Sequence, residues 1–351
     1  MNISRVLTVL VSVLLLSCNS GLKVKKVPDD VMQKIYDEVK TPYKYGIVMT
    51  SGDSTKMVDS PTVFRNNDKW FMTYIVFDGH GYETWLAESY DLLNWDILGK
   101  ILLFTKNTWD ATQKAGYVSL IDIEWGGSYK PEKFRDRFWM SYLGGSDRGY
   151  EAGKLKTGIA STEHIDIPQE WRCEGKPVLS PDDVNARWYD NATIYKSLII
   201  EDKEEYTGHS FVMYYNAKGD TARYESIAMA VSDDMKTWTR FGNAPVISKY
   251  RKGTICGDAQ ISRIGKVYVM FFFGAFWGDG PQAFDKFACS YDLIHWKEWQ
   301  GADLISPSET YDRKYAHKPW VVKWNDVVYH FYTAVGDHGR VIALATSEKL
   351  N

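Results

Sequence analysis

The stretch GTICGDAQISRIGKVYVMFFFGA (253–275) predicts a β-hairpin whose first strand is headed by a single acid, Asp258. Its second strand, 267–275, is almost wholly aromatic and aliphatic, which is typical of a strand buried on both faces. One aspartate before one strand is weak evidence of a functional site. The same arrangement repeated along the chain would instead indicate a repeat architecture.

The arrangement does recur, in five segments spaced by roughly 60–70 residues. Each segment has a strand opened by an acid or a histidine, an aromatic second strand, and a third strand that ends in a small residue and serine. The opening strands are DSPTVF (59–64), DIEW (122–125), DNATIY (190–195), GDAQIS (257–262) and HKPWVV (317–322), and the second strands are 69–77, 137–145, 210–218, 267–275 and 328–336.

Five sheet units without helices between them predict an all-β fold, a five-bladed β-propeller. A β-sandwich and a parallel β-helix are the alternatives. The segment PDDVMQKIYDEVK (28–40) predicts a short N-terminal helix outside the ring, and YGIVMT (45–50) is expected to add an outer strand to the last blade. We expect a linker and helix over 18–44 and the propeller over 45–351.

The first residues have the pattern of a secretory signal peptide, predicted over 1–17. One positive charge, Arg5, precedes a short apolar run. The letters LLSC (15–18) resemble the lipobox of bacterial lipoproteins, in which Cys18 would carry the lipid. A plain signal peptide or a short membrane anchor is the alternative. We therefore expect a lipid-anchored protein of the bacterial cell envelope that contacts the membrane only through this anchor.

Composition narrows the class of partner. The chain of 351 residues has a formal net charge of −3 and no basic block, which argues against a nucleic-acid partner. It also has 14 tryptophans and 23 tyrosines, whose flat amphipathic rings suit strand-rich cores and platforms for sugars. An oligosaccharide is thus a better candidate partner than a nucleic acid.

The heads of the first strands should lie at one mouth of the central channel. In a four-stranded blade, the loop between the second and third strands returns to that same end. Carboxylates gathered there would shift one another's pKa values, which can provide both an acid and a base. For each strand-head acid, the alternative is a structural role in accepting backbone N–H bonds.

The five-fold repeat and the stretch DSPTVFRNNDKWFMTY (59–74) resemble the five-bladed propeller glycoside hydrolases over residues 45–348. That group includes family forty-three, family one hundred and seventeen, the invertase-like enzymes and the mannoside phosphorylases. The resemblance implies that Asp59 is the base or nucleophile and that Asp122 tunes pKa values. Family forty-three has its acid, a glutamate, at the third strand head, where this sequence has Asp190.

The resemblance implies an exo-acting, inverting glycoside hydrolase acting on a plant or algal oligosaccharide. A non-catalytic carbohydrate-binding propeller and a glycoside phosphorylase are the alternatives. No cofactor is required, and a structural or central calcium near His317 is compatible with the pattern. The general acid is left open between Asp190, Glu225 and a residue of another blade. The predicted catalytic residues are Asp59, Asp122, Asp190, Glu225 and Asp258, and the predicted substrate contacts are Glu83, Trp85, Glu151, Arg187, Trp188, Trp277, His317 and Arg340.

Overall fold

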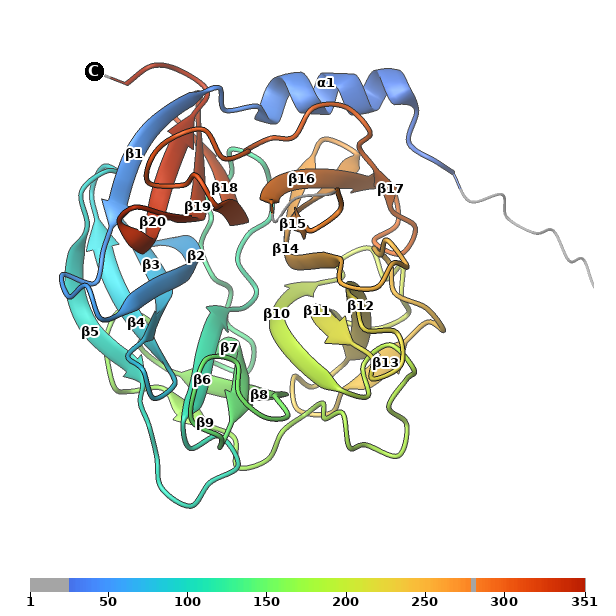
Figure 1. Cartoon of the computed structure of the whole chain (residues 1–351). Helices are drawn as coiled ribbons and strands as arrows, with labels where there is room; N and C mark the ends of the chain where they lie inside the picture. Colours follow the sequence, from blue (N-terminus) through green and yellow to red (C-terminus); the bar gives the residue numbers. More distant parts are fainter. Residues whose placement is uncertain (1–24, 279–281, 351) are drawn as a thin grey trace, which may run out of the picture.

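The computed structural model describes residues 25–278 and 282–350. In this part of the chain, five antiparallel sheets are arranged around a central axis (Figure 1). The fold is the predicted five-bladed β-propeller. The predicted signal peptide and Cys18 lie outside the described residues.

Each blade is an antiparallel sheet of four strands. Blade one contains β2 (Met57–Asn66), β3 (Lys69–Phe77), β4 (Tyr82–Ser89) and β5 (Asp96–Leu102). Blade two contains β6 (Gln113–Val118), β7 (Phe138–Gly145), β8 (Lys156–Thr162) and β9 (Arg172–Cys173). Blade three contains β10 (Thr193–Glu201), β11 (Phe211–Lys218), β12 (Glu225–Ser232) and β13 (Thr239–Phe241).

The last two blades follow the same order, and the N-terminal strand completes the ring. Blade four contains β14 (Ile255–Ile264), β15 (Val267–Ala275), β16 (Ala283–Ser290) and β17 (Lys297–Glu298). Blade five contains β18 (Tyr315–Trp324), β19 (Val327–Gly336), β20 (Gly339–Thr346) and β1 (Tyr43–Met49). The expected outer strand is therefore confirmed: the N-terminal β1 pairs with the C-terminal β20.

The aromatic second strands form the core of the blades. All nine residues of β15 are buried, and β3 and β11 are buried except at their ends. Each second strand lies between two strands of its own sheet, and neighbouring blades cover its faces, so both faces must be apolar. This requirement explains the continuous hydrophobic runs that made the repeat visible in the sequence.

Helix α1 (Asp29–Val39) packs on the rim of the ring, as predicted (Figure 1). Its buried face consists of Met32, Ile35 and Val39, which join a cluster with Phe271 and Phe287 of blade four. Two aspartates in the first turn suit the positive end of the helix dipole. No helix among the described residues is long and apolar enough to cross a membrane.

Four of the inner strands carry a β-bulge close to their heads. The pairing register skips two residues at Ser60–Pro61, Tyr195–Lys196, Asp258–Ala259 and Lys318–Pro319, opposite one residue of the second strand. Three of the bulge residues have positive φ: 50° at Ser60, 57° at Asp258 and 63° at Lys318. A bulge changes the direction of the side chain it carries. The bulges thus place polar side chains around the axis.

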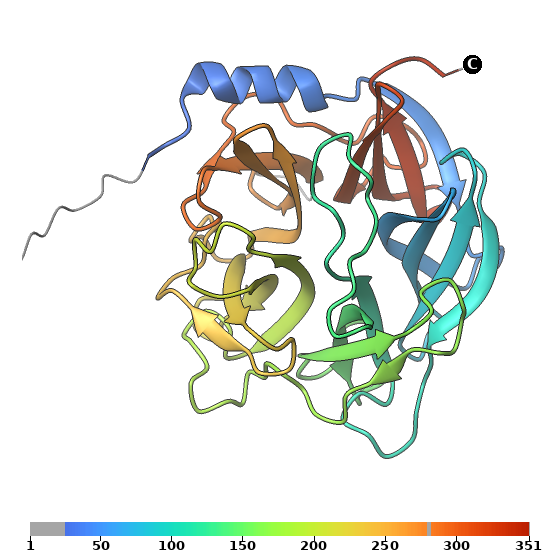
Figure 2. The same cartoon turned by 180° about the vertical axis from the view of Figure 1, so that it is seen from behind.

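The second blade differs from the prediction. Its inner strand is β6, whereas the expected strand 122–125 belongs to a long segment, 119–137, that crosses the centre of the ring (Figure 2). In this segment the Tyr129 carbonyl accepts from Arg65 N at 2.9 Å, and the Tyr129 hydroxyl accepts from Lys323 N at 2.8 Å. These partners lie at the far ends of the inner strands of blades one and five. The segment therefore covers the end of the channel opposite the strand heads.

Replacing Tyr129 by phenylalanine should destabilise the protein. The buried hydroxyl accepts from two backbone N–H groups, Gly126 N at 2.9 Å and Lys323 N at 2.8 Å. Their loss should lower the free energy of unfolding by about 1–3 kcal/mol, measured by urea denaturation. Tyr250→Phe, at a tyrosine that is 59% exposed, is the control. Equal stabilities of the two variants would contradict this role of Tyr129.

Candidate active site

A narrow cavity lies on the axis at the strand heads. The volume open to the centre of a water-sized sphere is about 40 Å³. All five blades contribute to its walls, so it is centred on the ring. The lining residues are Asp59, Ser60, Ile75 and Tyr82 of blade one, Ala115, Tyr117, Leu143 and Glu151 of blade two, Tyr195, Lys196, Asn216 and Glu225 of blade three, Asp258 and Phe273 of blade four, and Lys318 of blade five.

Asp59 is held as a carboxylate by two cations. Its Oδ2 accepts from Lys318 Nζ at 3.0 Å and from Arg340 Nη1 at 2.8 Å, and its Oδ1 accepts from Thr333 Oγ1 at 2.9 Å. Burial alone would raise the pKa of Asp59, but Arg340 and Lys318 outweigh it and hold the pKa well below its usual range. Such a carboxylate is a weak base.

Glu151 reaches the cavity from the loop between β7 and β8. Its φ of 49° lies in the left-handed region, an uncommon conformation for a residue other than glycine. The preceding part of the loop is held by Gln113, whose Nε2 donates to the carbonyls of Asp147 and Gly149 at 2.8 Å. Burial raises the pKa of Glu151, and although Lys318 opposes the rise, the negative charge of Asp59 adds to it.

Glu225 enters the cavity from the next blade, as the first residue of β12. Its Oε1 accepts from Lys218 Nζ at 3.1 Å, across the β11–β12 pair. Burial raises the pKa of Glu225 to about 7, against the opposing charge of Lys218. The negative charge of Glu151 also raises this pKa, so the two glutamates are electrostatically coupled. One of them can therefore hold a proton near neutral pH while the other is ionised.

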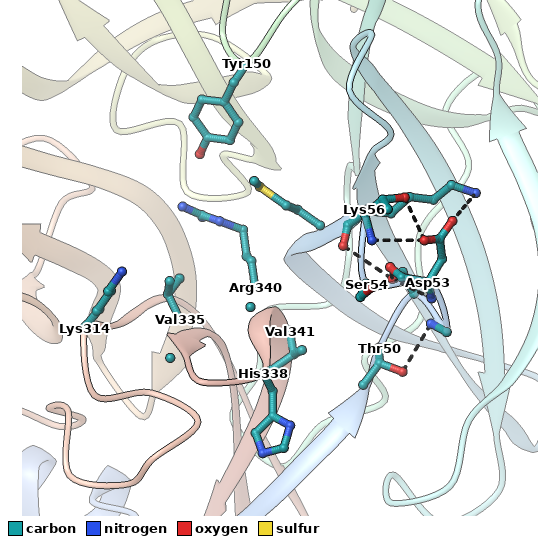
Figure 3. Close-up of a pocket in the computed structure, with 16 residues that line it drawn as sticks. Thr50, Asp53, Ser54, Lys56, Tyr150, Lys314, Val335, His338, Arg340 and Val341 are labelled. Carbon is teal, nitrogen blue, oxygen red and sulfur yellow. Dashed lines mark hydrogen bonds and ion pairs between the residues drawn. The ribbon is translucent and has the colours of Figure 1, made fainter.

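A second, open basin of about 600 Å³ adjoins this cavity (Figure 3). It is lined by residues 50–57, by the β19–β20 turn, and by Tyr150 and Arg340. Arg340 also bonds Asp59 inside the cavity, and the Tyr150 ring lies 5.7 Å from that of Tyr82, a cavity residue. The basin thus continues the cavity towards solvent.

The fold and the site can now be compared with known proteins. One solved structure, described as "Glycoside hydrolase", is 46% identical with a TM-score of 0.90, and the match covers 93% of this chain and 97% of that one. A second, described as a complex of BT0996 with RGII, matches with the same values. This chain belongs to the propeller glycoside hydrolases.

More distant structures share the fold of this hydrolase. A family 117 glycoside hydrolase of the marine bacterium Zobellia galactanivorans is 14% identical with a TM-score of 0.61, and the match covers 88% of this chain and 90% of that one. A thermostable family-43 glycoside hydrolase is 15% identical with a TM-score of 0.60, covering 87% and 91%. No family model and no curated protein matches the chain.

The structure brings four of the predicted site acids together in the cavity of the hydrolase: Asp59, Glu151, Glu225 and Asp258. Asp122 and Asp190, expected at the same mouth, lie elsewhere. The Asp122 carboxylate accepts from Ser128 Oγ at 2.6 Å within the crossing segment 119–137. Asp190 precedes β10 and bonds Arg240 Nε at 2.6 Å, away from the axis. Their predicted placement was wrong because neither residue heads an inner strand.

Two predicted contacts of blade one face the outer part of the blade. Glu83 is buried, and its carboxylate lies 2.6 Å from Lys100 Nζ of β5. Trp85 packs against the core, with Lys100 Nζ 5.5 Å from its ring. Neither residue lines the cavity, because β4 is the third strand of its blade and these side chains face β5.

Three further predicted contacts also lie outside the cavity lining. Trp277 donates from Nε1 to the Ile255 carbonyl at 2.8 Å and packs against the core. Arg187 and Trp188 lie in the loop before β10, and Trp188 is 47% exposed. An exposed indole at this place keeps the predicted role of Trp188 as a sugar platform open to test.

His317 does not provide a suitable calcium site. Its Nδ1 is 3.0 Å from the Thr333 carbonyl, and its Nε2 is 3.5 Å from Arg340 Nη1. Burial lowers the pKa of His317, and the positive charges of Arg340 and Lys318 lower it further. Calcium prefers oxygen ligands, whereas the surroundings of this ring are cationic. Within the described ranges, no group of three or more His, Cys, Asp or Glu side chains could hold a metal ion.

Proposed function

We propose that this hydrolase removes a terminal sugar from an oligosaccharide, with Glu151 and Glu225 as its catalytic carboxyl pair. The observation that carries the proposal is the axial cavity, in which two glutamates of adjacent blades both have raised pKa values. An exo mode follows from the shape of the site. The cavity is narrow and the segment 119–137 covers the opposite end of the channel, so a polysaccharide could enter only with its end.

Glu225 is the better candidate for the general acid. With a pKa of about 7, it holds a proton in a large fraction of molecules near neutral pH. It can donate this proton to the glycosidic oxygen as the bond breaks. Glu151 would then activate water or attack the anomeric carbon. Asp59 is a poorer candidate for this base, because Arg340 and Lys318 hold its charge.

The more similar of the solved structures suggest a substrate. One of the two structures with 46% identity is described as a complex with RGII. We propose that this hydrolase acts on an oligosaccharide of the same kind, derived from a plant or algal polysaccharide. The rest of the substrate would extend through the open basin beside Tyr150 and Arg340. From the resemblance to family forty-three, we expect inversion at the anomeric carbon.

A product screen tests the proposal. The purified protein is incubated with RGII oligosaccharides in buffers with and without phosphate, and products are identified by mass spectrometry and NMR. We expect a single terminal sugar to be released at the same rate in both buffers. Release of internal fragments would contradict the exo mode, and a requirement for phosphate would indicate a phosphorylase. Absence of any product would contradict the choice of RGII as substrate.

The pH dependence of the reaction should follow the two glutamates. Since Glu225 must be protonated to act as an acid, kcat/KM should fall above a pH of about 7, approaching tenfold per pH unit. On the acid side, kcat/KM should fall as Glu151, whose pKa is raised, becomes protonated. A profile measured on the released sugar tests both limbs. A rate that stays constant between about pH 6 and pH 9 would exclude Glu225 as the acid.

We also propose that the protein is anchored by a lipid on Cys18 at the bacterial cell envelope. The support is the sequence LLSC (15–18) after an apolar run. Labelling of cells with a fatty acid, compared between the natural chain and Cys18→Ala, tests this proposal.

A further inference from the structure

The cavity contains a buried cation that the mechanism does not use. Lys196 of β10 is only 2% exposed, and no atom within the described residues forms a hydrogen bond with its ammonium group. Its Nζ is 4.9 Å from the Tyr117 ring and 5.8 Å from the Trp320 ring. A buried charge without hydrogen bonds costs several kcal/mol. Lys196 thus lacks partners that a ligand in the cavity could provide.

The nearby carboxylate of Asp258 also has unused hydrogen-bonding capacity. Asp258 Oδ1 accepts from Asn216 Nδ2 at 2.8 Å, and Asp258 N donates to Asn216 Oδ1 at 2.8 Å. The other oxygen, Oδ2, has only a long contact of 3.5 Å with Ser60 Oγ and lies 3.7 Å from Lys196 Nζ. The last distance is too long for a hydrogen bond. An acceptor and a donor therefore stand side by side at the cavity wall.

The charges around the cavity indicate a neutral ligand. With Glu225 protonated, the negative groups are Asp59, Glu151 and Asp258. The positive groups are Lys196, Lys318 and the Arg340 that bonds Asp59. The two sets balance, so a sugar carboxylate would bring an unpaired charge into a buried site.

We propose that Lys196 and Asp258 bind two neighbouring hydroxyl groups of a neutral terminal sugar. The Lys196 ammonium donates to one hydroxyl oxygen, and Asp258 Oδ2 accepts the O–H of the next. The 3.7 Å gap between the two groups is close enough for both to reach hydroxyls on adjacent ring carbons. This inference rests on the proposed function for the place of the sugar. It adds the recognition of the sugar and its charge class.

Binding of monosaccharides, measured by NMR titration, tests the inference without turnover. The probes are L-arabinose, L-rhamnose, D-galactose, D-xylose and D-galacturonate. We expect a neutral sugar to bind the natural protein more tightly than D-galacturonate does. Its Kd should rise at least tenfold in Lys196→Met, since each charge-assisted hydrogen bond contributes about 1.5–3 kcal/mol. Tighter binding of D-galacturonate, or no binding of any neutral sugar, would overturn the inference.

Charge-balanced double variants separate recognition from folding. Lys196→Met with Asp258→Asn removes both charges together, so the variant avoids a buried unpaired carboxylate. The matched control is Lys114→Met with Asp110→Asn, a buried pair 3.5 Å apart in blade two and outside the cavity. Only the first double variant should lose sugar binding. Equal affinities of the two double variants would overturn the inference.

The two proposals can fail separately. If neutral sugars bind but oligosaccharides are not cleaved, the proposed function fails while the sugar site stands. If oligosaccharides are cleaved and the Lys196 variants bind sugar normally, only the sugar site fails.

Discussion

Replacement of Glu225 by glutamine is expected to lower kcat/KM by about 10²–10⁴-fold, because the glutamine cannot donate a proton to the leaving oxygen. Glu151→Gln should cause a loss of similar size through the missing base. Both are measured as release of sugar from an RGII oligosaccharide, and urea denaturation verifies the fold. Asp122→Asn makes a comparable change in a carboxylate outside the cavity and should leave the rate unchanged.

Two further measurements distinguish the acid from the base. With an aryl glycoside whose phenol is a good leaving group, Glu225→Ala should recover much of its activity, because the departing phenolate needs no proton. Glu151→Ala should instead be rescued by added azide or formate, which take the place of the missing carboxylate. If the two variants behave in the opposite way, the roles of the two glutamates are exchanged. If neither responds, the pair is not catalytic.

The variant Asp59→Asn would be a poorer test of catalysis. It leaves Lys318 and Arg340 buried around a neutral amide, and removal of one partner of a buried ion pair typically costs about 3–5 kcal/mol. Lost activity in this variant could therefore come from lost structure. Glu151 accepts no hydrogen bond from other described residues, so its replacement is less disruptive.

The ring of blades could be predicted because burial on both faces imposes a continuous apolar pattern. The predicted second strand 69–77 coincides with β3, and the prediction 267–275 coincides with β15. The second inner strand could not be identified in this way, because QKAGYV (113–118) has no acid or histidine at its head. The segment 122–125 has the expected acid but lies in the crossing segment 119–137.

The misplacement of Asp190 has a different cause, and the sequence held a signal for it. An aromatic residue followed by aspartate stands just before three inner strands, at 109–110, 189–190 and 311–312. Each of these aspartates accepts a hydrogen bond from a tyrosine of the second strand of its blade, at 2.8–2.9 Å. Asp190 thus belongs to a structural set, distinct from Asp59 and Asp258.

Lys196 could not be recognised from the sequence as part of the site. Whether a residue near a strand head faces the axis depends on the bulge, and the bulge appears only once the strands are paired. The raised pKa of Glu225 likewise depends on burial and on Glu151, which comes from another blade. Such properties arise from contacts between blades, which a single repeat does not contain.

Removal of Arg240 should have the largest effect on stability. Its guanidinium is 1% exposed, donates from Nε to Asp190 at 2.6 Å and from Nη1 to Asp183 at 2.9 Å, and donates from Nη2 to the Ser180 carbonyl at 2.7 Å. Arg240→Met would leave the fully buried Asp190 without its cation. We expect a loss of about 3–5 kcal/mol in the free energy of unfolding, a large part of what holds a typical domain folded.

The loss is measured by urea denaturation, with Arg137→Met as the matched control. Arg137 also pairs with a carboxylate, Glu163 at 2.8 Å, but its side chain is 31% exposed, so its removal should cost at most about 1 kcal/mol. The double variant Arg240→Met with Asp190→Asn should regain part of the loss, because it no longer buries an unpaired charge. Equal effects of Arg240→Met and Arg137→Met would show that blade three does not depend on this ion pair.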